Sequence, residues 1–305
     1  MTKDIINLAV VNFSAVWGDK EQNLKRILEY IDAAALKGAQ MVIFPETCLT
    51  GYDPEDEDMN REDRMQRLLS ETIPGPATEC ICERTKRYGI YAVFGMPERD
   101  MKNPESVYNA AAVCGPEGLV GSCRKIHLPF HEHLWADAGD RPFIFHTPWG
   151  PVGLAICYDF YCFPEITRYF RAKGARLLLN CTAISTVETS GAGGFLGNLC
   201  LQYLAVNNDV FIASSNLCGK DRTSWFMGGS SILGPSVSAP GFHYHAGSRF
   251  LDPGADESGL FSATVDLSDV RHSFLSGVWG DGSGKRDWRP DQYIRWLRDM
   301  EEDDR

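Results

Sequence analysis

Apolar residues between positions 19 and 38 recur at the spacing of one helix face: Leu24, Ile27, Leu28, Ile31, Ala34 and Ala35. This pattern predicts an amphipathic helix, with Asp19 placed to cap its start and Gly38 to end it. Short apolar runs lie on either side, at 5–12 and 41–44, and the second is typical of a strand covered on both faces. The three segments together predict a β-α-β unit.

The alternation of strands and helices continues along the chain. Further helices are predicted at 77–88, 164–173 and 195–207, and further strands at 90–95, 176–180, 210–215, 230–233 and 260–265. Turn residues at 115–118 and 148–150 separate paired apolar runs, at 108–114 with 119–125 and at 143–147 with 152–157, which predict two hairpins. The acidic segment 53–63 is interpreted as a solvated loop. Hairpins within an alternating pattern imply mixed sheets in an α/β protein.

Neither a Gly/Ser-rich or Pro-rich linker nor a repeat of about 20–50 residues divides the sequence. We therefore expect one domain over residues 1–277. Residues 278–305 are expected to form a C-terminal extension. It combines loop residues with Tyr293, Trp296 and Leu297, and we expect it to pack at a dimer interface.

Composition and net charge argue against some classes of function. The chain of 305 residues is 44% hydrophobic and 23% charged, which is typical of a globular protein. Its net charge of -11 and the lack of a Lys/Arg-rich block argue against binding to nucleic acid or to an anionic membrane surface. With no apolar run near the roughly 18 residues of a spanning helix and no export signal, we expect a cytoplasmic protein whose ten cysteines are reduced.

Three short motifs carry reactive groups: 44–46 with Glu46, 125–129 with Lys125, and 153–159 with Cys157. Each group lies at or just past the end of a predicted strand, where open α/β sheets build their ligand sites. Taken singly, a loop Glu, a surface Lys and a core Cys are ordinary structural residues. Together they form a complete hydrolytic set, because a thiol supplies the nucleophile, a carboxylate moves its proton, and an ammonium stabilises an oxyanion.

These motifs, in this order, resemble those of the nitrilase superfamily, the carbon–nitrogen hydrolases. The resemblance extends from the first strand to about Tyr293. Its segments are 44–52, 124–128, 156–159, 163–165, 229–235, 259–267 and 289–293.

The resemblance implies a four-layer α-β-β-α sandwich with mixed sheets that assembles as a homodimer or higher homo-oligomer. It makes Glu46 the general base, Lys125 the electrophilic support and Cys157 the nucleophile of a Glu-Lys-Cys triad. The backbone N–H of Tyr158 would help to hold the oxyanion. Attack on a carbonyl would give a thioester and release ammonia or an amine, and water would then free the acid, with no cofactor or metal required.

Further site residues follow from the same comparison. A second glutamate after the lysine is common in the family, and Glu132 is the candidate here. Tyr52, Tyr158, Trp135 and Phe160 are candidates for substrate binding, although each of these aromatic residues is equally compatible with a core or dimer contact. The segment 157–165 is one residue longer than the usual family spacing, which would reshape the pocket near Phe160.

The substrate class is left partly open. Asp159 stands two positions after the nucleophile, where members that act on nitriles commonly have Glu, so a small amide or N-carbamoyl substrate is favoured over a nitrile. Transfer of the acyl group to a nucleophile other than water remains an alternative. A metal site at the His131-x-His133 and His243-x-His245 pairs, and a binding protein without turnover, are the alternatives from other classes.

Overall fold

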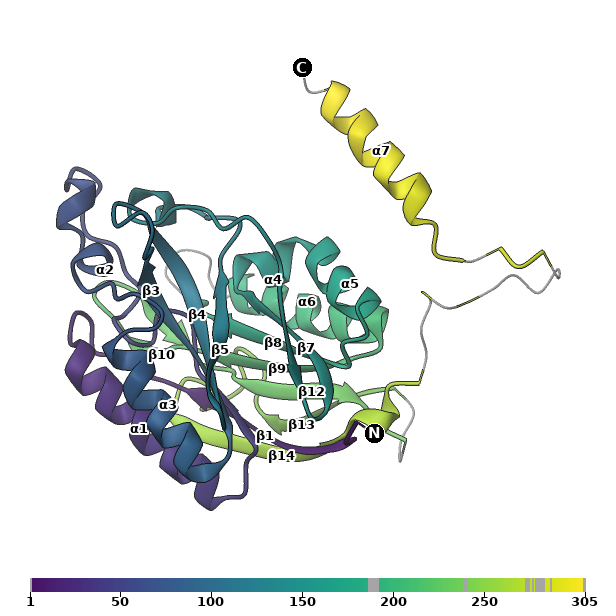
Figure 1. Cartoon of the computed structure of the whole chain (residues 1–305), viewed down its shortest axis with the longest axis horizontal. Coiled ribbons are helices and arrows are strands. Elements are labelled where there is room, and N and C mark those ends of the chain that lie inside the picture. The colour runs from purple at the N-terminus through teal and green to yellow at the C-terminus, as the bar shows by residue number, and fades with distance from the viewer. Residues whose placement is uncertain are drawn as a thin grey trace. The chain divides into compact units, whose positions relative to one another are not determined.

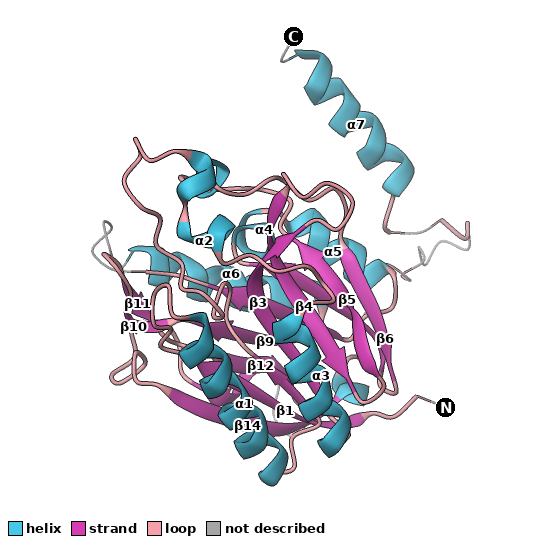
Figure 2. Cartoon of the chain, turned by 60° about the vertical axis from the view of Figure 1, so that its left-hand side comes forward, coloured by secondary structure: helices cyan, strands magenta, loops and turns pink. Residues whose placement is uncertain are grey.

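The computed structural model describes residues 2–185, 192–237, 241–271, 275, 277, 283–285 and 287–303. The chain divides into two compact units, Met1–Val270 and Arg271–Arg305. In the first unit, two six-stranded sheets lie face to face and helices cover their outer faces (Figure 1, Figure 2). The predicted four-layer α-β-β-α sandwich is confirmed.

The first sheet has the order β14-β1-β2-β3-β4-β5. Its strands are β1 (Ile5–Asn12), β2 (Met41–Ile43), β3 (Tyr91–Arg99), β4 (Val107–Gly115), β5 (Gly118–Arg124) and β14 (Gly259–Asp266). Strands β1, β2 and β3 are parallel, whereas β4, β5 and β14 pair antiparallel with their neighbours.

The second sheet has the order β13-β12-β9-β8-β7-β6 and the same mixed character. Its strands are β6 (Phe143–Thr147), β7 (Gly150–Ile156), β8 (Leu177–Thr182), β9 (Phe211–Asn216), β12 (Ser231–Pro235) and β13 (Phe242–Gly247). Here β7, β8 and β9 form the parallel centre. A separate small hairpin joins β10 (Cys218–Lys220) to β11 (Trp225–Met227).

Helices complete the layers. They are α1 (Lys20–Leu36), α2 (Met65–Leu68), α3 (Pro76–Tyr88), α4 (Tyr158–Cys162), α5 (Pro164–Ala172) and α6 (Ala192–Asn208), with short 3-10 helices at Arg61–Asp63, Glu132–Leu134 and Leu267–Asp269. Helices α1 and α3 pack on the first sheet, and α4, α5 and α6 on the second. None of the helices in the described part of the chain is long and apolar enough to cross a membrane.

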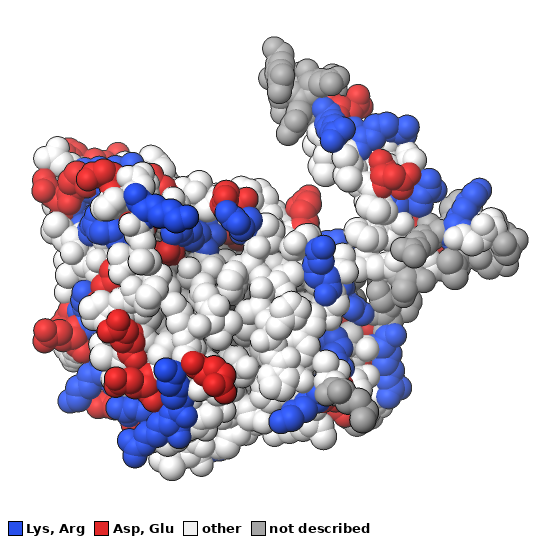
Figure 3. All heavy atoms as spheres, viewed as in Figure 1, with Lys and Arg blue, Asp and Glu red and all other residues white. Residues whose placement is uncertain are grey.

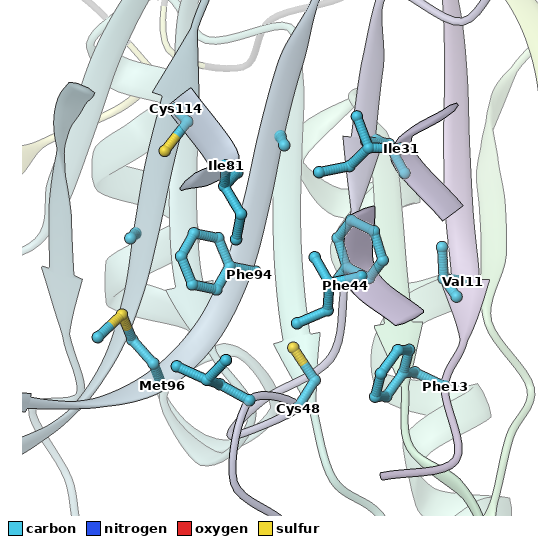
Figure 4. Packing of buried hydrophobic residues seen from close by; sticks show 14 of the residues in the cluster. Val11, Phe13, Ile31, Phe44, Cys48, Ile81, Phe94, Met96 and Cys114 are labelled. Carbon is cyan, nitrogen blue, oxygen red and sulfur yellow. The ribbon is translucent and has the colours of Figure 1, made fainter. Parts of the chain in front are cut away.

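Alternating strand residues build the core on both sides of each sheet. On β1, Leu8 and Val10 face the second sheet, while Ala9 and Val11 face the helices. Figure 4 shows the helix side, where Phe44 and Phe94 project from the first sheet toward Ile31 and Ile81. Strands covered on both faces explain why 5–12 and 41–44 are nearly continuous apolar runs.

Most predicted elements are present, with shifted ends. The strand at 5–12 matches β1, and the Asp19 carboxylate caps α1 by accepting the Gln22 N–H at 3.0 Å. Sequence reasoning missed the short elements α2, α4, β10, β11 and β13, and it ended β3 four residues early. Elements of three to six residues are too short to show a hydrophobic period.

The interpretation of 53–63 as a solvated loop was wrong for its first residue. Asp53 is only 2% exposed, and its Oδ2 accepts the N–H groups of Thr223 and Ser224. Acidic and basic side chains lie intermingled over the part of the molecule around α2 (Figure 3). One pair joins Glu62 of this segment and Arg67 at 3.0 Å. The acidic residues of this segment are therefore partly used in structural contacts.

The second unit contains helix α7 (Pro290–Asp303), where the sequence analysis predicted no secondary-structure element. Its apolar side chains Ile294, Trp296, Leu297 and Met300 are exposed. The expected boundary at 278 lies outside the described residues. Packing of this extension at a dimer interface stays a prediction.

Candidate active site

Glu46 follows β2 on a turn that lies against the neighbouring strand β3. The Gly95 N–H donates to the Pro45 carbonyl at 3.0 Å, and the Leu49 N–H donates to the Gly95 carbonyl at 3.2 Å. A Cβ at Gly95 would come within 2.6 Å of the Glu46 Cα, so only glycine allows this approach. Thr47 continues the turn with a φ of 44°. The Glu46 side chain is fully buried.

Lys125 follows β5 and is also fully buried. Its N–H donates to the Asn109 carbonyl of β4 at 2.8 Å, which extends the pairing of the two strands by one residue. The ammonium donates to Glu46 Oε1 at 2.7 Å and to Glu132 Oε1 at 2.5 Å. One cation therefore joins two buried carboxylates.

Glu132 begins a 3-10 helix in the loop after Lys125 and is 5% exposed. Besides the ammonium, its Oε1 accepts the Tyr52 hydroxyl at 2.8 Å. The Asn109 amide donates to Glu132 Oε2 at 3.0 Å and to Glu46 Oε1 at 2.8 Å. Tyr52 is thus held at the site through Glu132.

Sequence reasoning missed Asn109. The available signal was an amide side chain inside the otherwise apolar run 107–114, at a position that is fully buried. A buried amide needs hydrogen-bond partners, and here both partners are carboxylates of the site.

Cys157 lies between β7 and α4, with a φ of 47° that non-glycine residues rarely adopt. Its N–H donates to the Cys181 carbonyl at 2.9 Å and to Asn180 Oδ1 at 3.1 Å. Its carbonyl accepts the N–H groups of Phe160 and Tyr161 in the first turn of α4. These contacts to β8 and α4 support a strained backbone, as is common for residues that must present a side chain to a reactant.

Asp159 connects the Cys157 segment to the Lys125 segment. Its carboxylate accepts the N–H of Ile126 at 2.8 Å and that of His127 at 2.9 Å, and it lies 2.8 Å from His127 Nδ1. Asp159 is 1% exposed. Asp159 therefore helps to fix the position of Lys125 relative to Cys157 by holding the backbone that follows Lys125.

Burial controls the charges at the site. Desolvation raises the pKa of Glu46 to about 7, with Glu132 adding to the shift while Lys125 and Asn109 oppose it. Burial raises the pKa of the Cys157 thiol above its usual range; the Glu46 charge adds to this and the Lys125 charge opposes it. Cys157 is thus within electrostatic reach of both groups and rests as a thiol. Burial alone would lower the pKa of Lys125, but the adjacent carboxylates raise it, so the ammonium stays charged.

The four candidate substrate-binding aromatics fall into two pairs. Tyr52 contacts Glu132 and Tyr158 follows Cys157, so both lie beside the reactive groups. Trp135 is 2% exposed and packs with Val107, and Phe160 is fully buried in the core under α5 and α6. Burial favours a packing role for these two, and their contact with substrate stays a prediction.

The two histidine pairs lie in different local structures. His131 precedes the 3-10 helix that holds His133, so these two residues do not share a strand face, and His131 Nδ1 lies 3.5 Å from Glu57. His243 and His245 lie on β13 with ring centroids 6.4 Å apart. Within the described residues, no three His, Cys, Asp or Glu side chains are grouped as metal ligands.

A family model described as carbon-nitrogen hydrolase matches residues 7–273. The chain belongs to this family. It is therefore a carbon–nitrogen hydrolase, as the motifs predicted.

Relatives with assigned names include both amidases and nitrilases. An omega-amidase of Xenopus tropicalis is 34% identical over 265 residues, which cover 81% of this chain and 84% of that protein. A nitrilase of Pyrococcus abyssi is 29% identical over 235 residues, covering 76% and 83%.

Solved structures show the same fold. An amidase from Nesterenkonia sp. superposes with a TM-score of 0.72 at 22% identity, covering 97% of this chain and 98% of that one. A mutant of the amidase from Nesterenkonia sp. AN1, with the acetamide moiety of fluoroacetamide added covalently at its active site cysteine, gives a TM-score of 0.73 at 23% identity, covering 97% and 99%.

Replacing Lys125 tests the buried charge arrangement. Lys125→Met leaves two buried carboxylates without their cation, so we expect the free energy of unfolding to fall by about 3–5 kcal/mol. Urea titration measures this change. Lys25→Met is the matched control, because the Lys25 side chain is 77% exposed, and we expect it to change stability by less than about 0.5 kcal/mol. Equal stability of the two variants would contradict the arrangement.

Proposed function

We propose that this enzyme hydrolyses the carbon–nitrogen bond of a small amide or N-carbamoyl compound through a thioester on Cys157. One observation carries the proposal. Glu46 Oε2 is buried and, within the described part of the chain, has no hydrogen-bond partner, whereas Oε1 accepts both Lys125 and Asn109. A buried carboxylate oxygen without a donor is costly, and the thiol of Cys157 is a proton source within electrostatic reach.

The first half of the reaction forms the thioester. Glu46 takes the Cys157 proton as the sulfur attacks the substrate carbonyl, which avoids a free thiolate in a buried site. The Lys125 ammonium and the Tyr158 N–H stabilise the oxyanion; Tyr158 is the first residue of α4, where helix N–H groups lack an intrahelical acceptor. Glu46 then gives its proton to the leaving nitrogen, and ammonia or an amine departs.

The second half of the reaction hydrolyses the thioester and regenerates the free enzyme. Glu46 takes a proton from water as the water oxygen attacks the thioester carbonyl. The carbon–sulfur bond then breaks to release the acid, and Glu46 returns the proton to the departing sulfur of Cys157. A pKa of about 7 suits Glu46 for both steps, because near neutral pH it accepts and donates protons with comparable ease. Glu132 accepts a second hydrogen bond from the Lys125 ammonium, and it positions Tyr52 by accepting the Tyr52 hydroxyl.

Two observations support an amide over a nitrile. The omega-amidase relative has the higher identity over the longer alignment, 34% over 265 residues against 29% over 235 for the nitrilase relative. Asp159 stands two positions after Cys157, where members that act on nitriles commonly have Glu, and its carboxylate accepts the N–H groups of Ile126 and His127. Nitrile hydrolysis is the second candidate.

Paired substrates decide between these candidates. The amide and the nitrile of one small carboxylic acid are incubated separately with the enzyme, and ammonia release is followed. We expect faster release from the amide. Faster release from the nitrile would overturn the amide assignment, and release from neither, across a panel of amides and N-carbamoyl compounds, would count against the proposed substrate class.

The nucleophile is tested by comparing two cysteines near α4. Cys157→Ala should reduce turnover by at least about a thousandfold, because no other group can form the thioester. Cys162 is exposed and lies five residues after Cys157. The Cys162→Ala variant should keep substantial activity. Circular dichroism checks that both variants fold. With the wild-type enzyme, hydroxylamine should intercept the thioester and give a hydroxamate. Loss of activity in the Cys162 variant alone would place the nucleophile elsewhere.

The base is tested through its pKa. The Asn109 amide stabilises the charged form of Glu46, so Asn109→Ala should raise the Glu46 pKa above about 7. Because the base works deprotonated, the acid limb of the kcat/KM profile should move up by about one pH unit, and activity lost at pH 7 should return at higher pH. Asn103→Ala, in an exposed turn, should leave the profile unchanged. An unmoved acid limb in Asn109→Ala would contradict the role of Glu46.

A further inference from the structure

A cavity of about 320 Å³ lies between α3 and the turn that joins β4 to β5. Cys82, Glu79, Glu83 and Lys86 line it from α3, and Gly118 and Leu119 line it from the turn. None of these residues belongs to the catalytic cluster.

A second thiol lies directly behind Cys82. Cys114 of β4 is fully buried, and its Sγ is 2.9 Å from that of Cys82. Both cysteines are free. A disulfide needs a sulfur separation of about 2.05 Å, so side-chain movement of less than about 1 Å would join them.

The two thiols differ in reactivity. The hydrogen bond with Cys114, together with the charge of Lys86, holds the pKa of Cys82 below its ordinary value, although burial opposes this. The contact with Cys82 and burial raise the pKa of Cys114. Cys82, which reaches the cavity, is therefore the thiol that reacts first, and Cys114 is placed to attack it afterwards.

We propose that Cys82 and Cys114 form a reversible dithiol–disulfide site that reacts with a small peroxide admitted through the cavity. Cys82 Sγ attacks one peroxide oxygen, the O–O bond breaks, and Cys82 becomes a sulfenic acid while water leaves with the thiol proton. Cys114 Sγ then attacks Cys82 Sγ, the S–O bond breaks, and a second water leaves. The two sulfurs lose two electrons in total, which reduce hydrogen peroxide to two waters.

The disulfide would join α3 to β4 without touching the catalytic groups. On β4, Cys114 lies five positions beyond Asn109, which is about 17 Å along the strand. The bond closes a loop between residues 32 positions apart. Its formation should raise Tm by about 5 °C, because it restricts the unfolded chain.

The test uses the full chain carrying Cys157→Ala, so that the nucleophile does not compete for oxidant. After treatment with equimolar hydrogen peroxide, the remaining thiols are alkylated under denaturing conditions and peptides are mapped by mass spectrometry. We expect a peptide pair linked through Cys114, loss of two hydrogens from the intact mass, and recovery of both by dithiothreitol.

Added substitutions identify the partner. Cys80→Ser, at the exposed cysteine of the same helix, should keep the link, and Cys82→Ser should abolish it. Cys114→Ala should leave a Cys82 sulfenic acid that dimedone traps. In an otherwise wild-type chain, Cys82→Ser should keep turnover within about twofold. The proposal is overturned if Cys114 is fully alkylated after peroxide treatment while the exposed cysteines are oxidised, or if the link survives Cys82→Ser.

Discussion

The ammonium of Lys125, held between two buried carboxylates, is the contact on which the rest of the site depends. Burying a single charge costs several kcal/mol, and the cost is recovered only when the partners are close and their remaining lone pairs are satisfied. Asn109 and Tyr52 supply additional donors to Glu132 and to Glu46 Oε1, and Glu46 Oε2 is left without a donor within the described part of the chain. The strands therefore position a charged network, and this network in turn sets the proton affinity of Glu46.

Backbone strain lies at or near Glu46, Cys157 and Glu132. Thr47 follows Glu46, Cys157 carries the thiol, and Phe130 precedes Glu132 by two residues, and all three have positive φ. Each such residue costs about 1–3 kcal/mol. The two sheets, with their extensive apolar faces, provide the rigid support that such backbone conformations require.

The mixed α/β character could be predicted because the central strands and the first helix have clear hydrophobic patterns. The four-layer sandwich was predicted from the resemblance of the motifs to those of the nitrilase superfamily. Glu46, Lys125 and Cys157 could be singled out because each follows a strand, and the structure brings the first two into contact and places the third within electrostatic reach. Asn109 could not be found this way, since its role depends on which side chains a neighbouring strand and a distant loop bring to it. Helix α4 was missed because five residues show no period. The catalytic roles themselves remain predictions for the experiments on the enzyme.

The contacts of Asp159 affect how the two sheets can move relative to each other. Lys125 belongs to a segment that leaves the first sheet, and Cys157 to one that leaves the second, so sliding of one layer over the other would misalign nucleophile and cation. The Asp159 carboxylate fastens the two segments by gripping two successive amide groups. The alignment of nucleophile and cation is therefore set by a contact between the two sheets as well as by the sheets themselves.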